Sequence, residues 1–172
     1  IHLLETKNPL AAGLTSADVV TVFIDSKNNT WVGTWNSGLF YLKDGSNKFK
    51  NIQINNSGGV LKSNRIMSFA EDSKGNIWIG SFLSGLYSYN SEQSKLIHHQ
   101  EPALKDQYID SKNIRKVLVD IDDNIWLGTR TGLYKLSNMT KNPRVESYNL
   151  FGASSMRIEA TISCVSIDRF FV

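Results

Sequence analysis

Three side chains suited to sugar binding occupy the same place in three similar stretches of the sequence. Trp35, Phe82 and Arg130 each directly follow a Gly-Thr or Gly-Ser pair. Aromatic rings stack on the apolar faces of sugars, and a guanidinium donates hydrogen bonds to hydroxyl or carboxylate groups. This set favours a carbohydrate ligand. The alternative is that the two rings cover neighbouring loops and that Arg130 is solvated.

Two more arginines are candidates for the same site. Arg65 and Arg115 stand near the starts of two predicted inner strands, which places them at the same edge of the fold. Salt bridges to neighbouring repeats would explain both residues equally well.

The other reactive side chains do not form a site. His98 and His99 are adjacent in a predicted strand, so their side chains point to opposite faces and cannot readily share a metal. The acidic stretch at 120–123 lacks the glutamate that completes a calcium loop. Cys164 is predicted to be a small buried apolar residue. We find no nucleophile, phosphate-binding or zinc motif, and we predict no catalytic residue, metal or cofactor.

An internal repeat must position these residues. Residues 19–40, 66–87 and 114–134 share the pattern D-x-x-x-N-x-W-x-G-[T/S] followed by G-L-[F/Y]. Their tryptophans, Trp31, Trp78 and Trp126, are 47 and 48 residues apart, and Asp25, Asp72 and Asp120 have the same spacing. One more step of 48 residues reaches Asp168, in what resembles the opening of a fourth copy.

Short β-branched runs separated by turn residues predict strands. In the first unit these are residues 19–24, 30–34, 39–43 and 49–54, and residues 96–100 and 145–150 are predicted outer strands of the next two units. Four antiparallel strands in about 47 residues are typical of a β-propeller blade. The predicted fold is all-β, an incomplete propeller ring of about three and a half blades.

The constant residues of the repeat have structural explanations. The aspartates are predicted to accept backbone N–H groups two residues on, and the turns need a positive φ at Asn28, Gly75 and Asp123. Each tryptophan is predicted to fill the gap between two blades. The glycines that follow allow close backbone approach of the next blade; they are Gly33, Gly80 and Gly128.

The second unit, IMSFAEDSKGNIWIGSFLSGLYSYN, resembles the two-component-regulator propeller repeat. The first and third units depart from that pattern only in the turn, at residues 28–30 and 122–123. Such repeats are typical of the periplasmic sensor regions of hybrid two-component histidine kinases in Bacteroidetes. The resemblance implies a periplasmic location and a sensor for glycans or oligosaccharides. In that family, blades precede a further β-domain, a membrane helix and the kinase.

The repeat divides the chain into predicted units. Residues 1–13 would end a preceding blade, residues 14–60, 61–108 and 109–155 would form one blade each, and residues 156–172 would begin the next. We expect a fragment of a larger sensor, whose partners are the remaining blades of the parent propeller. A short protein whose copies complete a ring is the alternative.

Composition narrows the classes of function. The chain has 172 residues, 41% hydrophobic residues and a formal net charge of +3, and its scattered lysines do not form the clustered basic face of a nucleic-acid binder. No apolar run approaches the ~18–20 residues of a membrane helix. We therefore expect a non-catalytic sensing module with an oligosaccharide ligand, without nucleic-acid or membrane contacts. The alternatives are a protein-interaction scaffold and a propeller enzyme such as a lyase.

Overall fold

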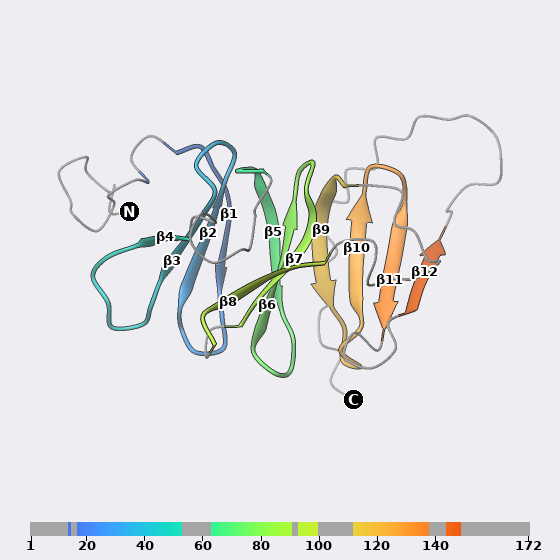
Figure 1. Cartoon of the computed structure of the whole chain (residues 1–172). Helices are drawn as coiled ribbons and strands as arrows, with labels where there is room; N and C mark the ends of the chain where they lie inside the picture. The colour runs from blue at the N-terminus through green and yellow to red at the C-terminus, as the bar shows by residue number, and fades with distance from the viewer. Residues whose placement is uncertain are drawn as a thin grey trace.

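The computed structural model describes residue 14 and residues 17–52, 63–90, 93–99, 112–137 and 144–148. These residues form strands and turns but no helix, and the strands make three four-stranded antiparallel sheets that stand side by side (Figure 1). We call the sheets blades 1, 2 and 3. Residues 1–13, predicted to end a preceding blade, and residues 156–172, predicted to begin the next blade and containing Cys164 and Asp168, lie outside the described residues.

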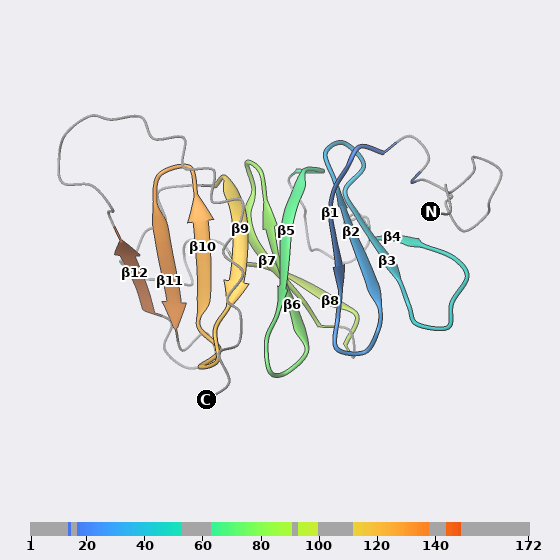
Figure 2. The same ribbon diagram turned by 180° about the vertical axis from the view of Figure 1, so that it is seen from behind.

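Each blade is a simple meander in which consecutive strands pair. Blade 1 contains β1 (Val19–Ile24), β2 (Thr30–Thr34), β3 (Leu39–Leu42) and β4 (Lys50–Ile52). Blade 2 contains β5 (Ile66–Glu71), β6 (Asn76–Ser81), β7 (Gly85–Asn90) and β8 (Lys95–His99). Blade 3 contains β9 (Ile114–Val119), β10 (Ile125–Thr129), β11 (Leu133–Ser137) and β12 (Arg144–Tyr148). The inner strands β1, β5 and β9 lie next to one another (Figure 2).

The predicted strands of blade 1 agree with the structure most closely near the repeat motif. The predicted ranges 19–24 and 30–34 are those of β1 and β2, whereas 39–43 is one residue too long for β3. The outer strand β4 is shorter than the predicted 49–54, since residue 49 is outside the strand. The outer strands β8 and β12 each begin one residue earlier than predicted. Residues 53–54, 100 and 149–150 are not among the described residues.

Each hairpin between the first two strands of a blade closes on one aspartate. In blade 1, Asp25 Oδ1 accepts the backbone N–H of Lys27 (3.0 Å) and Asn29 (2.8 Å). Asp25 Oδ2 accepts the Asn29 amide and the Trp31 indole N–H, both at 2.9 Å. The same bonds recur at Asp72 and Asp120. The predicted backbone bonds two residues on are confirmed, and the carboxylate also fixes the indole.

The backbone of these turns has the predicted handedness. Asn28 (φ 59°), Gly75 (φ 74°) and Asp123 (φ 59°) occupy the left-handed region, which glycine, asparagine and aspartate tolerate best. We call the edge of the three sheets that carries these turns the turn rim; it is the lower edge in Figure 1. The opposite edge, formed by the β2–β3, β6–β7 and β10–β11 connections and by the residues just before β1, β5 and β9, is the loop rim.

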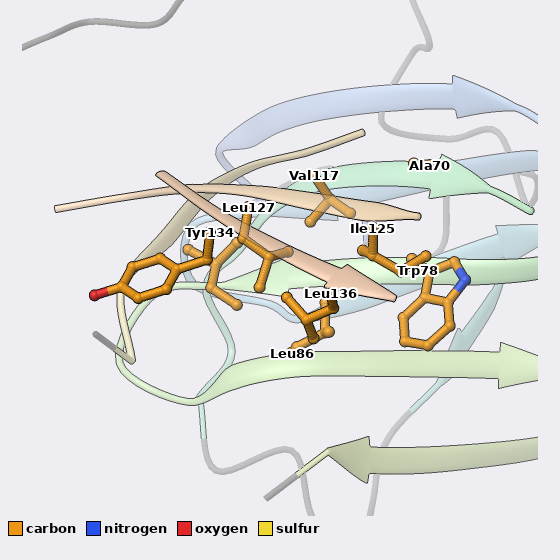
Figure 3. Close-up of a cluster of buried hydrophobic side chains, with 9 residues drawn as sticks. Ala70, Trp78, Leu86, Val117, Ile125, Leu127, Tyr134 and Leu136 are labelled. Atoms are coloured by element: carbon orange, nitrogen blue, oxygen red, sulfur yellow. The ribbon is translucent and has the colours of Figure 1, made fainter. Parts of the chain in front are cut away.

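Two apolar clusters hold the blades together. Trp31 is fully buried between blades 1 and 2, against the side chains of Leu39, Ile66, Phe69, Ile77, Ile79 and Tyr87. Figure 3 shows the second cluster, between blades 2 and 3, which contains Ala70, Trp78, Leu86, Ile114, Val117, Ile125, Leu127, Tyr134 and Leu136. Successive residues of β6 face opposite clusters, so one strand serves both interfaces.

Two glycines of the motif set the spacing of the blades. A Cβ atom on Gly33 would lie 2.7 Å from Ile66 Cγ2, and one on Gly80 would lie 2.7 Å from Ile114 Cγ2. These are distances that side chains do not tolerate, so glycine is required for β5 and β9 to approach β2 and β6. The predicted close approach is confirmed at these two positions.

Polar clamps join the same blades at the turn rim. The backbone N–H and the hydroxyl of Ser26 in blade 1 both donate to the Glu71 carboxylate of blade 2, at 2.7 Å each. Ser73 of blade 2 donates in the same way to Asp123 of blade 3. The turns of blades 1 and 2 are therefore each bound to the next blade by a carboxylate that takes two hydrogen bonds.

The outer faces of blades 1 and 3 differ from the inner ones. Val22 is 59% exposed, whereas the residues at its position in blades 2 and 3, Phe69 and Val117, are 6% and 0% exposed. Trp126, predicted to fill a gap between blades, is only partly buried and stacks on Tyr148 of its own blade, with 5.5 Å between ring centroids. Its indole lies on the face of blade 3 that a following blade would cover, so its burial depends on residues beyond those described.

Candidate functional site

The connections at the loop rim share one geometry. The hydroxyls of Thr34, Ser81 and Thr129 donate to the carbonyls of Gly38 (2.8 Å), Gly85 (2.9 Å) and Gly132 (2.9 Å). Gly38 and Gly85 both have a φ of 81°, which residues with a Cβ rarely adopt. The constant residues of the repeat thus build the loop, and the next residue in each, at 35, 82 and 130, is left free to vary.

Backbone hydrogen bonds tie these loops to the segments before the inner strands. Gly38 N of blade 1 donates to Asn64 O of blade 2 at 3.0 Å, and Phe82 N donates to Arg65 O at 3.0 Å. Residues 64 and 65 are thereby held between the loop of blade 1 and the loop of blade 2. This position brings the Arg65 side chain to both loops.

Trp35, Phe82 and Arg65 form one contact group, which we call the rim cluster. The Trp35 and Phe82 ring centroids are 5.6 Å apart, with 37° between the ring planes. The Arg65 Cζ atom lies over both rings, 4.8 Å from the Trp35 centroid and 5.4 Å from the Phe82 centroid. Trp35 is 39% exposed, and Phe82 and Arg65 are partly buried. Three of the five residues predicted from the sequence therefore meet across the junction of blades 1 and 2.

The other two predicted residues stand apart from this cluster. Arg130 is exposed in the β10–β11 connection of blade 3, and no contact joins it to the rim cluster within the described part of the chain. Arg115 is exposed on β9 at a register shift, where Ile114 pairs with Thr129 and Lys116 with Gly128. A bulge of this kind turns a side chain out of the regular alternation.

The junction of blades 2 and 3 contains a polar cap where the first junction contains the cluster. Asn113 occupies the repeat position of Arg65, and its Oδ1 accepts the backbone N–H of Leu83 at 2.9 Å. Leu83 has a φ of 72° and is 57% exposed. Sequence reasoning missed both residues. The available signal was the alignment of Asp18, Arg65 and Asn113 at one repeat position.

The two adjacent histidines point to opposite sides of blade 2, as predicted. His98 stacks on Tyr87 with 4.3 Å between ring centroids, whereas His99 lies 4.9 Å from Trp78. The His99 ring is 2.8 Å from the Ser88 hydroxyl. Burial, with a smaller contribution from His98, lowers the pKa of His99 to about 4. Within the described residues, no three His, Cys, Asp or Glu side chains are grouped so as to hold a metal ion.

The three sheets, with adjacent inner strands and tryptophans packed between blades, define a segment of a β-propeller. Residues 60–82 match the family model described as two component regulator propeller. The chain therefore carries the repeat that its sequence resembles. No helix in the described residues is both long and apolar enough to span a membrane.

Solved structures support this assignment. The extracellular domain of the hybrid two-component system BT3049 from B. thetaiotaomicron is 25% identical, with a TM-score of 0.62 over 78% of this chain and 17% of that one. The extracellular domain of the one-component system BT4673 from the same organism is 19% identical, with a TM-score of 0.58 over 77% of this chain and 18% of that one.

A lyase has the same fold. Virginiamycin B lyase from Staphylococcus aureus is 13% identical, with a TM-score of 0.59 over 79% of this chain and 42% of that one. At this identity the likeness concerns the fold alone. No curated protein matches the sequence. The chain spans less than a fifth of the length of the two Bacteroides proteins.

Proposed function

We propose that this chain is part of an extracytoplasmic, non-catalytic sensor domain of a two-component system, located in the periplasm, and that it recognises an oligosaccharide. The matched propeller repeat and the similarity to an extracellular domain of a hybrid two-component system support the sensor role. The carbohydrate ligand is supported by the composition and position of the rim cluster.

The rim cluster is the observation that carries the proposal. Two aromatic rings from different blades, 5.6 Å apart, provide apolar surface for a sugar ring, and the guanidinium beside them provides hydrogen-bond donors. Folding does not require these residue types, since the third repeat builds the same loop with Arg130 in place of an aromatic residue. Trp35 is partly exposed, and the blade can fold with another residue type at its position, so its ring is available to contact a ligand.

Oligosaccharide binding to the full chain tests this proposal. A panel of neutral and acidic oligosaccharides is titrated by calorimetry into the wild-type protein and into Trp35→Ala, Phe82→Ala and Tyr148→Ala. Tyr148 is the matched control because it is 38% exposed and lies on the outer strand of blade 3, whereas the rim cluster lies at the junction of blades 1 and 2. We expect about a tenfold loss of affinity for each rim variant and no change for the control. Equal losses in all three variants, or no binding to any saccharide, would contradict the proposal.

The exposed apolar face of β1 indicates that a further blade packs against it. Val19, Val22 and Ile24 of β1 are 52%, 59% and 63% exposed, and the corresponding face of β5 is packed against blade 1. We infer that a preceding blade of the parent propeller, or another copy of this chain, covers β1. Sedimentation of the full chain distinguishes them: association that Val22→Asp abolishes indicates another copy, and a monomer at all concentrations excludes it.

A further inference from the structure

The guanidinium of Arg65 is held in place without any polar partner among the described residues. Its Cζ atom lies over the Trp35 and Phe82 rings, and no hydrogen bond or ion pair joins its N–H groups to another described side chain or carbonyl. Stacking uses the face of a guanidinium and leaves the donors at its edge available, in a fork that matches a planar anion. The aromatic rings therefore position five donors that remain unused in this part of the chain.

Charge is distributed unevenly between the two rims. The described residues at the loop rim include the bases Arg65, Lys112, Arg115 and Arg130, and one acid, Asp18, whose carboxylate is 3.4 Å from the Asn36 amide. Five of the turn-rim carboxylates, by contrast, already accept hydrogen bonds from turn amides, indoles and serines; they are Asp25, Glu71, Asp72, Asp120 and Asp123. The loop rim is thus the basic edge of the described blades.

We propose that the loop rim recognises an anionic saccharide, in which a carboxylate or a sulfate group binds the guanidinium edge of Arg65. The exposed Trp35 ring packs against the sugar that carries the anion, and Arg130 and Lys112 add long-range attraction that falls with ionic strength. This inference rests on the proposed function because it names the class of oligosaccharide. It also makes a separate claim, namely that an anion binds at Arg65 whether or not a sugar carries it.

Arginine side-chain NMR of the full chain tests the inference directly. The Arg65 Nε–H signal is assigned by its loss in Arg65→Lys, and Arg144→Lys provides the matched control because Arg144 is exposed at the turn-rim end of β12. Four sugar probes form two pairs: methyl glucuronide with methyl glucoside, and glucose 6-sulfate with glucose. Inorganic sulfate is the fifth probe.

We expect methyl glucuronide or glucose 6-sulfate to shift the Arg65 signal in the wild type and in Arg144→Lys. The affinity for the neutral member of each pair should be lower by a factor of about ten or more. A response confined to one pair identifies carboxylate or sulfate as the natural group. Equal shifts with neutral and anionic sugars, or no shift with any anion, would overturn the inference.

The same spectra separate this inference from the proposed function. Neutral oligosaccharides that shift the Trp35 indole signal and leave Arg65 unaffected would support a carbohydrate site and overturn the anionic one. If inorganic sulfate shifts Arg65 as strongly as any sugar, and Trp35→Ala leaves all affinities unchanged, the anion site stands and the carbohydrate proposal fails.

Discussion

The two rims of the blades are built from the same repeat but use it differently. At the turn rim, each of three aspartates accepts hydrogen bonds from two backbone N–H groups, an asparagine amide and an indole. At the loop rim, the constant residues close the connections, while the residue types at 35, 82 and 130 differ. The three turn-rim aspartates have hydrogen-bond partners within their own turns, whereas the loop rim leaves an arginine with donors that no described residue uses.

This difference separates residues that the fold needs from residues that a ligand can use. Buried polar groups without partners are costly, so the network around Asp25, Asp72 and Asp120 can lose no member without penalty. The rim cluster is partly exposed, and its contacts contribute roughly 0.5–1 kcal/mol for a cation over a ring. Substitutions at the two rims should therefore differ in stability and in binding.

The largest expected effect is at a buried tryptophan anchored in the turn rim. Trp78 is 5% exposed, packs between blades 2 and 3 and donates its indole N–H to Asp72. Trp78→Ala should lower the free energy of unfolding by about 3–5 kcal/mol, because it leaves a cavity and removes one of the hydrogen bonds to the Asp72 carboxylate. Urea unfolding measures this loss. A melting temperature that falls equally in Trp78→Ala and Trp35→Ala would remove the distinction between the rims.

Acid should affect the two rims in different pH ranges. His99, near the loop-rim end of β8, has a pKa of about 4 instead of 6.5. The unfolded chain therefore binds this proton first, and stability falls as the pH drops from 6.5 to 4, by up to about 3 kcal/mol. Thermal unfolding from pH 7 to 4 measures the loss, and His99→Gln should remove most of it. An unchanged pH profile in that variant would contradict the assignment.

The stability that the turn-rim carboxylates contribute should be lost only at a lower pH than the stability linked to His99. Burial raises the pKa of Asp25, but hydrogen bonds from Trp31 and Asn29 outweigh it and hold the pKa below 3.8. The pKa of Asp123 is lowered mainly by the hydrogen bonds from Ser73. Since both pKa values are depressed on folding, the stability that they contribute is present above pH 3.8 and is lost as the pH falls through the lower folded values.

A smaller effect is expected at the clamp between blades 2 and 3. Ser73→Ala removes the hydroxyl that donates to Asp123 and keeps the backbone N–H that donates to it at 2.9 Å. The free energy of unfolding should fall by about 1 kcal/mol, the usual net value of one hydrogen bond. Ser46→Ala is the control, because Ser46 is an exposed serine in the β3–β4 turn and, among the described residues, has no bond to another blade. A loss of the same size in Ser46→Ala would mean that the clamp adds nothing.

The sequence predicts most of the structural features that are determined by residues close together in the chain. The ends of β1 and β2, the positive φ at Asn28 and the spacing role of Gly33 follow from turn chemistry and from the repeat. The outer strand β4 is less well predicted, since it pairs with one strand only and its pattern is weak. The partial burial of Trp126 was not predicted because it depends on what lies against blade 3.

The residues of the candidate site were also predictable from the sequence only in part. Trp35 and Phe82 could be identified because the repeat aligns them at a position that varies. Their contact with Arg65 depends on the junction between blades, where Gly38 N bonds Asn64 O, and no local pattern indicates it. Arg130, aligned with the two aromatic residues, belongs to the loop of blade 3 and not to the junction of blades 1 and 2, and the segment before β9 carries Asn113 where blade 2 carries Arg65.

The smallest effect on stability, and a large one on binding, is expected at Trp35. Trp35→Ala removes a ring that is 39% exposed and touches Phe82 and Arg65, so the free energy of unfolding should change by no more than about 1 kcal/mol. Affinity for the saccharide should fall about tenfold in the same protein. Urea unfolding and calorimetry on one preparation measure both quantities.

Trp35→Phe is the informative partner variant: it keeps an aromatic face, as Phe82 does at the same position of blade 2, and should recover most of the binding. If Trp35→Phe binds no better than Trp35→Ala, the loop rim does not bind the saccharide by ring stacking. The functional difference between the turn rim and the loop rim would then rest on Arg65 alone.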